Sequence, residues 1–303
     1  MPNWFNPQNT SALIADIMWA LTSAGLSDRA SVTEIIKDDV GGVVAAGEFN
    51  GQPAIFKMYR GPDAGQVVQN AANALGTYAA RLTGPDVGIV RPLATLPEAG
   101  ILVMTRAPGQ MISRLIGDRK VDQIALIERC ARWLTACAAG DMQIRRLAPG
   151  KFVTELEEAK AAPDALTTRL ITVLKQQKPP LRGYPLIWGP THGDFSPVNL
   201  ADDGQRLTAF DVQGVPGMPL TRVAAFFLVS RDLNRAPPRQ TIWGLDAATT
   251  EAFLNALPPE IGEDTLALKF FVGHAMGRRW LGDSFVGKGR ANAEKRIRLY
   301  LQS

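Results

Sequence analysis

One short segment constrains this chain more than any other. Residues 192–199 read His-Gly-Asp-Phe-Ser-Pro-Val-Asn, and Asp211 follows twelve positions after the final Asn. Gly, Asp, Ser, Pro and Asn are turn residues, so the segment predicts a tight loop. The apolar run 207–210 leads into Asp211, and Asp203-Gly204 predicts a hairpin turn before that run. The hairpin would return a second carboxylate toward the loop, where carboxylate and amide oxygens suit a hard cation.

This pattern resembles the catalytic loop of the aminoglycoside phosphotransferase and choline kinase family, a branch of the protein-kinase-like fold, in which the loop commonly reads H-G-D-x-x-x-x-N. The resemblance implies that Asp194 is the catalytic base, Asn199 a magnesium ligand and Asp211 the second metal-binding residue. It also implies ATP and Mg²⁺ as cofactors and a small-molecule hydroxyl as acceptor. We interpret His192 as a structural imidazole that braces the loop. The alternative is that the segment is a surface turn and that Asp211 merely ends a strand.

A second set of residues resembles the nucleotide site of the same superfamily. Lys57 lies in a strand-like segment fifteen residues after Gly42, the spacing from the last glycine of a kinase glycine-rich loop to its phosphate-binding lysine. The resemblance implies that Gly41, Gly42 and Val44 also contact the nucleotide, since glycine lets backbone amides approach phosphate oxygens. The full G-x-G-x-x-G is absent. The ordinary alternatives are a solvated edge lysine and a plain turn between two strands.

The hydrophobic patterns predict an α+β chain, and the resemblance implies a protein-kinase-like two-lobed fold. Residues 1–108 would form a nucleotide-binding N-lobe, an antiparallel sheet with helices, and residues 109–303 a mostly helical C-lobe with the catalytic loop and the acceptor site. Met104 and Arg106 fall where the family's edge strand leads into its hinge, which implies nucleotide contacts. The predicted N-lobe elements are helices over 11–21 and 63–82 and five strands over 31–37, 43–49, 53–59, 90–96 and 101–105. Asn50-Gly51 predicts a hairpin between the second and third strands, and alternation in the third puts Lys57 on the face opposite Phe56. The predicted C-lobe helices cover 122–139, 152–175, 221–233, 246–257, 263–281 and 291–301, with 176–180 as a loop because of its paired prolines.

The chain also departs from the family pattern. The predicted helix 63–82 contains no Glu to pair with Lys57, so Gln66, Gln69 or Asp63 would have to serve. Arg222 stands where the family often has an Asp that helps to hold the catalytic loop. These departures favour an alternative function, a nucleotide-binding pseudokinase or regulatory module without transfer activity.

Composition and charge exclude several other classes. The formal net charge is only +4, and the Lys and Arg residues are scattered apart from Arg278-Arg279 and the last helix, 288–298, so nucleic-acid binding does not follow. The spacing in that last helix indicates a solvated face. Apolar runs stay below the roughly 18–20 residues that a membrane helix needs. The first residues lack the basic region of a signal peptide, and we therefore expect a cytoplasmic protein. Cys130 and Cys137, seven apart on a predicted helix, are too far apart for a disulfide and are expected to face the core.

The acceptor is constrained only by charge. Residues 212–303, where this family builds its acceptor pocket, contain eight acids and twelve bases. A polycationic aminoglycoside would need carboxylate partners once it is partly desolvated. The sequence therefore predicts a neutral or anionic hydroxyl compound, such as a sugar. It leaves the identity of the acceptor, the choice between ATP and GTP, and the oligomeric state open.

Overall fold

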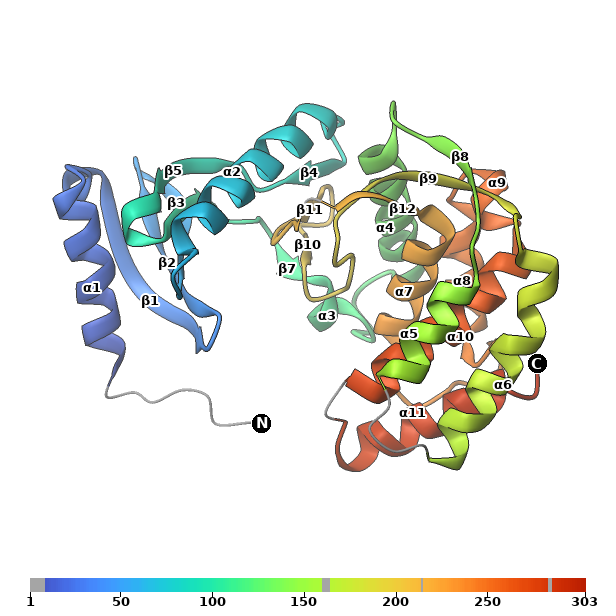
Figure 1. The fold of residues 1–303 in the computed structure, drawn as a ribbon. Coiled ribbons are helices and arrows are strands. Elements are labelled where there is room, and N and C mark those ends of the chain that lie inside the picture. The colour runs from blue at the N-terminus through green and yellow to red at the C-terminus, as the bar shows by residue number, and fades with distance from the viewer. Residues whose placement is uncertain (1–8, 160–163, 214, 283–284) are drawn as a thin grey trace. The chain divides into compact units, whose positions relative to one another are not determined.

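The computed structural model describes residues 9–159, 164–213, 215–282 and 285–303 (Figure 1). The chain divides into two compact units. The first unit comprises Met1–Pro108 together with Thr208–Gly214, and the second comprises Gly109–Leu207 together with Val215–Ser303. The segment that carries Asp211 therefore belongs to the first unit, although the rest of the chain after residue 108 forms the second.

A five-stranded antiparallel sheet forms the first unit, in the order β1-β2-β3-β6-β5. At the predicted β2–β3 hairpin, Asn50 and Gly51 have φ values of 52° and 71°, the left-handed conformation that a two-residue hairpin loop requires. The predicted strand over 90–96 is β5, and it is preceded by a short strand that was not predicted, β4, which pairs with β11 instead of joining the sheet. The strand bounds are β1 (Ala30–Asp39), β2 (Gly42–Phe49), β3 (Gln52–Tyr59), β4 (Val87–Ile89), β5 (Pro92–Leu96), β6 (Ile101–Thr105) and β11 (Leu207–Ala209).

One face of this sheet is closed by the N-terminal helix α1 (Thr10–Ser23). Ile17 and Leu21 of α1 pack with Phe49 and Phe56 of the sheet, and all four side chains are fully buried. Successive side chains of a strand point to opposite faces, so the burial of Phe56 turns Lys57 to the other side. On that side Lys57 and residues of α2 (Ala64–Arg81) line the same cavity. Helix α2 also packs against the one-turn 3₁₀ segment η3 (Pro97–Ala99), which lies between β5 and β6.

The second unit is mostly helical, as predicted. Its helices are α3 (Ile112–Leu115), α4 (Gln123–Ala138), α5 (Gly150–Glu158), α6 (Ala165–Leu181), α7 (Leu220–Asp232), α8 (Ala247–Asn255), α9 (Pro259–Gly262), α10 (Thr265–Gly282) and α11 (Gly287–Tyr300). Its strands are β7 (Gln110–Met111), β8 (Gln143–Arg146), β9 (Pro185–Thr191), β10 (Leu200–Asp202), β12 (Val215–Pro219), β13 (Thr241–Ile242) and β14 (Leu245–Asp246). Strand β9 lies between β8 and β12 and leads directly into the H-G-D loop. Cys130 and Cys137 of α4 are buried, as predicted, and neither is in a disulfide.

Two helix predictions in this unit are wrong. The predicted helix 152–175 is two helices, because α5 ends at Glu158 and α6 begins after Asp164, whose side chain caps it by accepting the Thr167 N–H at 2.7 Å. The predicted loop at 176–180 is the end of α6, which continues through Pro179 and Pro180. Prolines are tolerated there because each removes only its own N–H donor, while the Pro179 carbonyl still accepts the Arg182 N–H at 3.3 Å.

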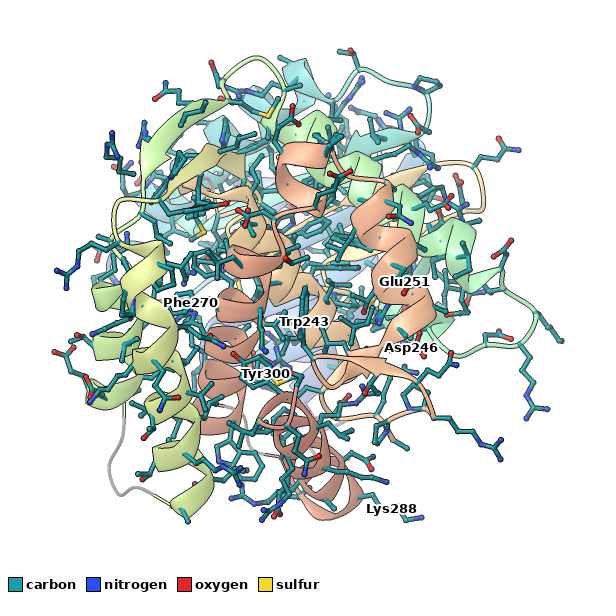
Figure 2. The ribbon with its side chains drawn as sticks, turned by 90° about the vertical axis from the view of Figure 1, so that its right-hand side faces the viewer. Trp243, Asp246, Glu251, Phe270, Lys288 and Tyr300 are labelled. Carbon is teal, nitrogen blue, oxygen red and sulfur yellow. The ribbon has the colours of Figure 1, made fainter. Side chains whose placement is uncertain are left out.

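The charged residues of α11 were expected to lie on a solvated face, and for Arg296 this is wrong. Only 2% of Arg296 is exposed, and its guanidinium donates to the carbonyls of Arg235, Gly244 and Ala236 at 2.8, 2.7 and 3.1 Å. In Figure 2, Tyr300 of α11 lies in the interior of the unit, whereas Lys288 extends from the surface at the start of the same helix. Arg296 therefore joins α11 to the loop before β13 and to the β13–β14 turn.

Replacing this arginine should destabilise the second unit. Arg296→Met leaves three carbonyls without their donor, the buried one of Gly244 among them, and we expect a loss of about 3–5 kcal/mol in the free energy of unfolding. Arg298→Met is the matched control on the same helix, since Arg298 pairs with Glu294 at an exposed i,i+4 position. It should change stability by less than about 0.5 kcal/mol. Urea unfolding of the two variants followed by tryptophan fluorescence measures the difference, and equal stabilities would contradict the role of Arg296.

Candidate active site

Aromatic packing fixes the start of the H-G-D loop. His192 is fully buried, with its ring centroid 5.8 Å from that of Trp133. Phe195 stacks on Trp133 at 5.3 Å and packs against Phe227 of α7 at 4.9 Å. The Asp194 N–H points to His192 Nδ1 at 3.4 Å, a long contact. Because His192 is enclosed by ring systems and lies against the loop backbone, its placement is consistent with a bracing role.

The two polar residues predicted for this loop contact each other. Asn199 Nδ2 donates to Asp194 Oδ2 at 2.8 Å and to the Asp194 carbonyl at 3.0 Å. The Asn199 N–H donates to the Ser196 carbonyl at 3.0 Å, which closes the turn. Asn199 is 8% exposed, whereas the Asp194 side chain lies at an intermediate depth. The loop therefore presents an oriented carboxylate that a small molecule can reach.

In the first unit, Asp211 and Lys57 form an ion pair. Lys57 Nζ lies 2.5 Å from Asp211 Oδ1, and Nζ also lies 4.9 Å from the ring centroid of Tyr59. Burial disfavours the charged lysine, but the nearby Asp211 and Tyr59 outweigh it, so the pKa of Lys57 is raised. Asp211 has a φ of 60°, a left-handed conformation that is uncommon for a residue other than glycine. This backbone conformation holds the carboxylate against the lysine.

A cavity of about 420 Å³ opens beside this pair. Gly41, Gly42, Val44, Lys57 and Asp211 all line it, so the structure brings five of the predicted residues together. At Gly42, where φ is 143°, a Cβ would lie 2.1 Å from the Met58 carbonyl oxygen, so glycine is required at this turn.

The two predicted hinge residues do not line this cavity. Met104 is buried in β6 opposite Ile55 of β3. Arg106 is exposed, and its N–H donates to the Pro53 carbonyl at 3.0 Å. Their predicted contacts with a nucleotide stay a prediction.

The side of α2 that faces Lys57 carries Asn70, and the expectation for Gln66 and Gln69 is wrong. Those two glutamines and Asp63 line a separate cavity on the outer side of the helix. Asn70 lines the cavity of Lys57, and its Oδ1 accepts from Gln66 Nε2 at 2.9 Å. Because an amide offers no charge, α2 leaves the lysine to pair with Asp211.

No protein-family model matches the sequence, and no curated protein matches it either. Solved structures do. A ternary complex of aminoglycoside phosphotransferase APH(4)-Ia with AMP-PNP and hygromycin B has a TM-score of 0.63 at 13% identity, covering 95% of this chain and 98% of that one. An amicoumacin kinase in complex with AMP-PNP, Ca²⁺ and its antibiotic gives 0.60 at 14%, covering 96% and 95%. A choline/ethanolamine kinase family protein from Mesorhizobium loti gives 0.59 at 14%, covering 94% and 92%.

This chain has the aminoglycoside phosphotransferase fold. The similarity extends over nearly the whole length of both chains, which confirms the predicted protein-kinase-like architecture. At such identities it establishes the fold alone.

In this version of the aminoglycoside phosphotransferase fold, sequence reasoning missed two contacts at or next to the H-G-D loop. The Ser113 N–H donates to the Pro197 carbonyl at 2.9 Å. Arg129 of α4 forms a two-pronged ion pair with buried Asp202 of β10, with distances of 2.9 and 2.6 Å. No local sequence signal pairs Arg129 with a residue 73 positions away.

The residues present suit a magnesium ion held together with nucleotide phosphates. Asp211 supplies a carboxylate at the wall of the glycine-lined cavity of the first unit. Throughout the part of the chain that the structure describes, no group of three or more His, Cys, Asp or Glu side chains could hold a metal by itself. Magnesium typically takes one or two protein ligands and completes its shell with phosphate and water oxygens, so a single carboxylate beside a cavity, such as Asp211 in the first unit, is a donor of the kind it takes. In the same described residues, no helix is long and apolar enough to cross a membrane.

Proposed function

We propose that the protein is a Mg²⁺-ATP-dependent small-molecule kinase that phosphorylates a hydroxyl group. The observation that carries the proposal is the Asp194 carboxylate, oriented by Asn199 on an H-G-D loop within this fold. The acceptor oxygen would form a bond to the γ-phosphorus as the bond from that phosphorus to the β-phosphate oxygen breaks. Asp194 would take the hydroxyl proton, and ADP would leave.

The other predicted residues have the chemistry that this reaction needs. Lys57 and the amides around Gly41 and Gly42 would bind phosphate oxygens, and Asp211 with Asn199 would bind Mg²⁺. Val44, Met104 and Arg106 would contact the rest of the nucleotide. Mg²⁺ would neutralise charge on the phosphates, and the protein would hold the acceptor hydroxyl in line.

A second candidate is a nucleotide-binding pseudokinase or regulatory module. The amide of Asn70 on α2, where kinases commonly carry an acid, and the pairing of Lys57 with the proposed metal ligand favour it. Such a protein would bind ATP and transfer nothing.

An ADP-release screen over hydroxylated metabolites separates the two candidates. Wild type and Asp194→Ala are assayed in parallel, each with and without Mg²⁺. A kinase releases ADP with at least one acceptor, only with Mg²⁺ and only with Asp194 present. ATP binding without ADP release across the panel would favour the pseudokinase.

The acceptor is proposed to be neutral or anionic and not a polycationic aminoglycoside. One relative is described with hygromycin B, yet the corresponding part of this chain carries more basic than acidic residues. We expect kanamycin to be a poor substrate in steady-state kinetics. Efficient phosphorylation of kanamycin, with a low micromolar KM, would contradict this.

A further inference from the structure

A small cavity in the second unit adjoins the catalytic loop. Its volume is about 50 Å³, and Gly193 and Phe195, the two neighbours of Asp194, form part of its wall. Arg222 of α7 and His274 and Arg278 of α10 form the polar part. A water needs roughly 10–15 Å³ of such volume, so the cavity has room for on the order of three or four heavy atoms. That is the size of one carboxylate or phosphate group.

Arg222 enters this cavity without a strong partner. Its side chain is 16% exposed, and its Nη1 contacts the Met218 sulfur at 3.4 Å, a weak acceptor. Its Nη2 lies 3.9 Å from Glu155 Oε2, beyond hydrogen-bond distance. Its guanidinium carbon lies 5.2 Å from the ring centroid of Phe152. A largely buried guanidinium has five donors, and these contacts leave most of that capacity for a ligand.

Glu155 of α5 is the carboxylate that faces this group of bases. It contacts Arg278 Nε at 3.0 Å and His274 Nε2 at 3.2 Å. The hydrogen bond from His274, followed by the charges of Arg278 and Arg222, lowers the pKa of Glu155. Burial lowers the pKa of His274 despite that bond, so the imidazole is neutral near pH 7. Two guanidinium groups therefore face one carboxylate, which leaves one positive charge in excess.

Resting on the proposed kinase function, we propose that Arg222 and Arg278 bind an anionic group of the acceptor, a carboxylate or a phosphate. Glu155 is then an internal counter-ion that holds the two arginines until the substrate anion takes its place. The acceptor is a small hydroxyl compound with one such group, and its hydroxyl reaches Asp194 from the adjoining cavity. Planar guanidinium donors match carboxylate and phosphate oxygens in pairs, which explains why arginine rather than lysine lines the site.

The substrate test uses matched compounds that differ in charge. Glucose, gluconate and glucose 6-phosphate, and glycerol, glycerate and glycerol phosphate, are assayed for ADP release and for binding by calorimetry without ATP. Within each set the anionic compounds should bind more tightly than the neutral one. If the protein is a kinase, they should also have a higher kcat/KM than the neutral compound. The gluconate and glycerate arms report a carboxylate, and the two phosphate esters report a phosphate.

Three variants test the residues. Arg222→Gln and Arg278→Gln should each weaken binding of the anionic compounds by about 10- to 100-fold, the range for losing a hydrogen bond to a charged group. Glu155→Gln should strengthen that binding, because it removes the competing carboxylate. If the three residues formed only a structural ion-pair cluster, Glu155→Gln would not strengthen binding while the two arginine variants weaken it. Arg298→Gln, which removes an exposed arginine of α11, is the charge control and should leave binding unchanged.

The outcomes separate this inference from the proposed function. Binding of anionic compounds without ADP release supports the anion site and counts against the kinase. ADP release with neutral or cationic acceptors alone supports the kinase and overturns the anion site. Absence of binding by every anionic compound also overturns the site, whatever the turnover. Thermal unfolding of each variant confirms that it is folded, and Arg222→Lys, which keeps the charge but not the paired donors, should bind with intermediate affinity.

Discussion

Asp194→Asn should lower kcat by about 10²- to 10⁴-fold, the range for losing a positioned acid-base group. The replacement is nearly isosteric, and the Asn199 amide that now donates to Asp194 Oδ2 at 2.8 Å can donate to an amide oxygen instead. The aromatic contacts of Phe195 that fix the loop are untouched. Fold stability and nucleotide affinity should therefore stay close to wild type. Steady-state kinetics at saturating ATP, with calorimetric binding of ATP, measures both quantities.

A matched control lies nine residues along the chain. The Asp203 carboxylate accepts the N–H groups of Gln205 and Arg206 at 2.9 and 2.7 Å and so belongs to a turn. Asp203→Asn should leave kcat nearly unchanged. If Asp194→Asn turned over within about twofold of wild type, far short of the expected range, Asp194 would not be the base.

Local patterns predicted the parts of this molecule that local sequence determines. The Asn50-Gly51 hairpin and the alternation that separates Phe56 from Lys57 depend on adjacent residues, and the structure shows both. The contact between Asp194 and Asn199 joins residues five apart on the loop that the motif predicted. Such features need no knowledge of how distant elements pack.

Long-range partners could not be predicted in this way. The choice among polar residues of α2 depends on the rotation of the helix about its axis, and that rotation brings Asn70, not Gln66 or Gln69, to the cavity of Lys57. The partner of the lysine itself, Asp211, lies 154 residues away. Packing between distant elements determines both the residue of α2 that faces Lys57 and the residue that pairs with it. Hydrophobic periodicity and motif spacing in the sequence do not report such packing.

The position of Arg222 shows the same limit. The sequence reveals only that an acid is missing from the family pattern there. Three helices bring Arg222, Glu155 and Arg278 together, from positions up to 123 residues apart in the chain. From the sequence, the net charge of residues 212–303 could predict only that the acceptor is not polycationic. The group that would recognise the acceptor emerges only from the packing of α5, α7 and α10.

Asp211→Asn should raise the Mg²⁺ concentration for half-maximal activity by more than about 10-fold, since changing even an outer partner of a metal ligand typically costs 10- to 100-fold. Asparagine is the appropriate replacement because Asp211 has a φ of 60°, and asparagine tolerates this conformation better than alanine. The backbone should therefore stay in place while the negative charge is lost. Activity measured against Mg²⁺ at fixed ATP gives the midpoint, and an unchanged midpoint would exclude Asp211 as a metal ligand.

Lys57→Met distinguishes the two roles of this ion pair. Lys57 Nζ lies 2.5 Å from Asp211 Oδ1, so without nucleotide the lysine competes with Mg²⁺ for the carboxylate. Removing the lysine should strengthen Mg²⁺ binding to the free protein, measured by calorimetry, because the carboxylate no longer has a cationic partner. The same change should raise the KM for ATP, because a phosphate-binding charge is lost. Asp211→Asn should weaken Mg²⁺ binding in the same assay. Stronger Mg²⁺ binding in Lys57→Met and weaker Mg²⁺ binding in Asp211→Asn would support the exchange of Lys57 for Mg²⁺ at Asp211. A change of Mg²⁺ affinity in the same direction in both variants would refute it.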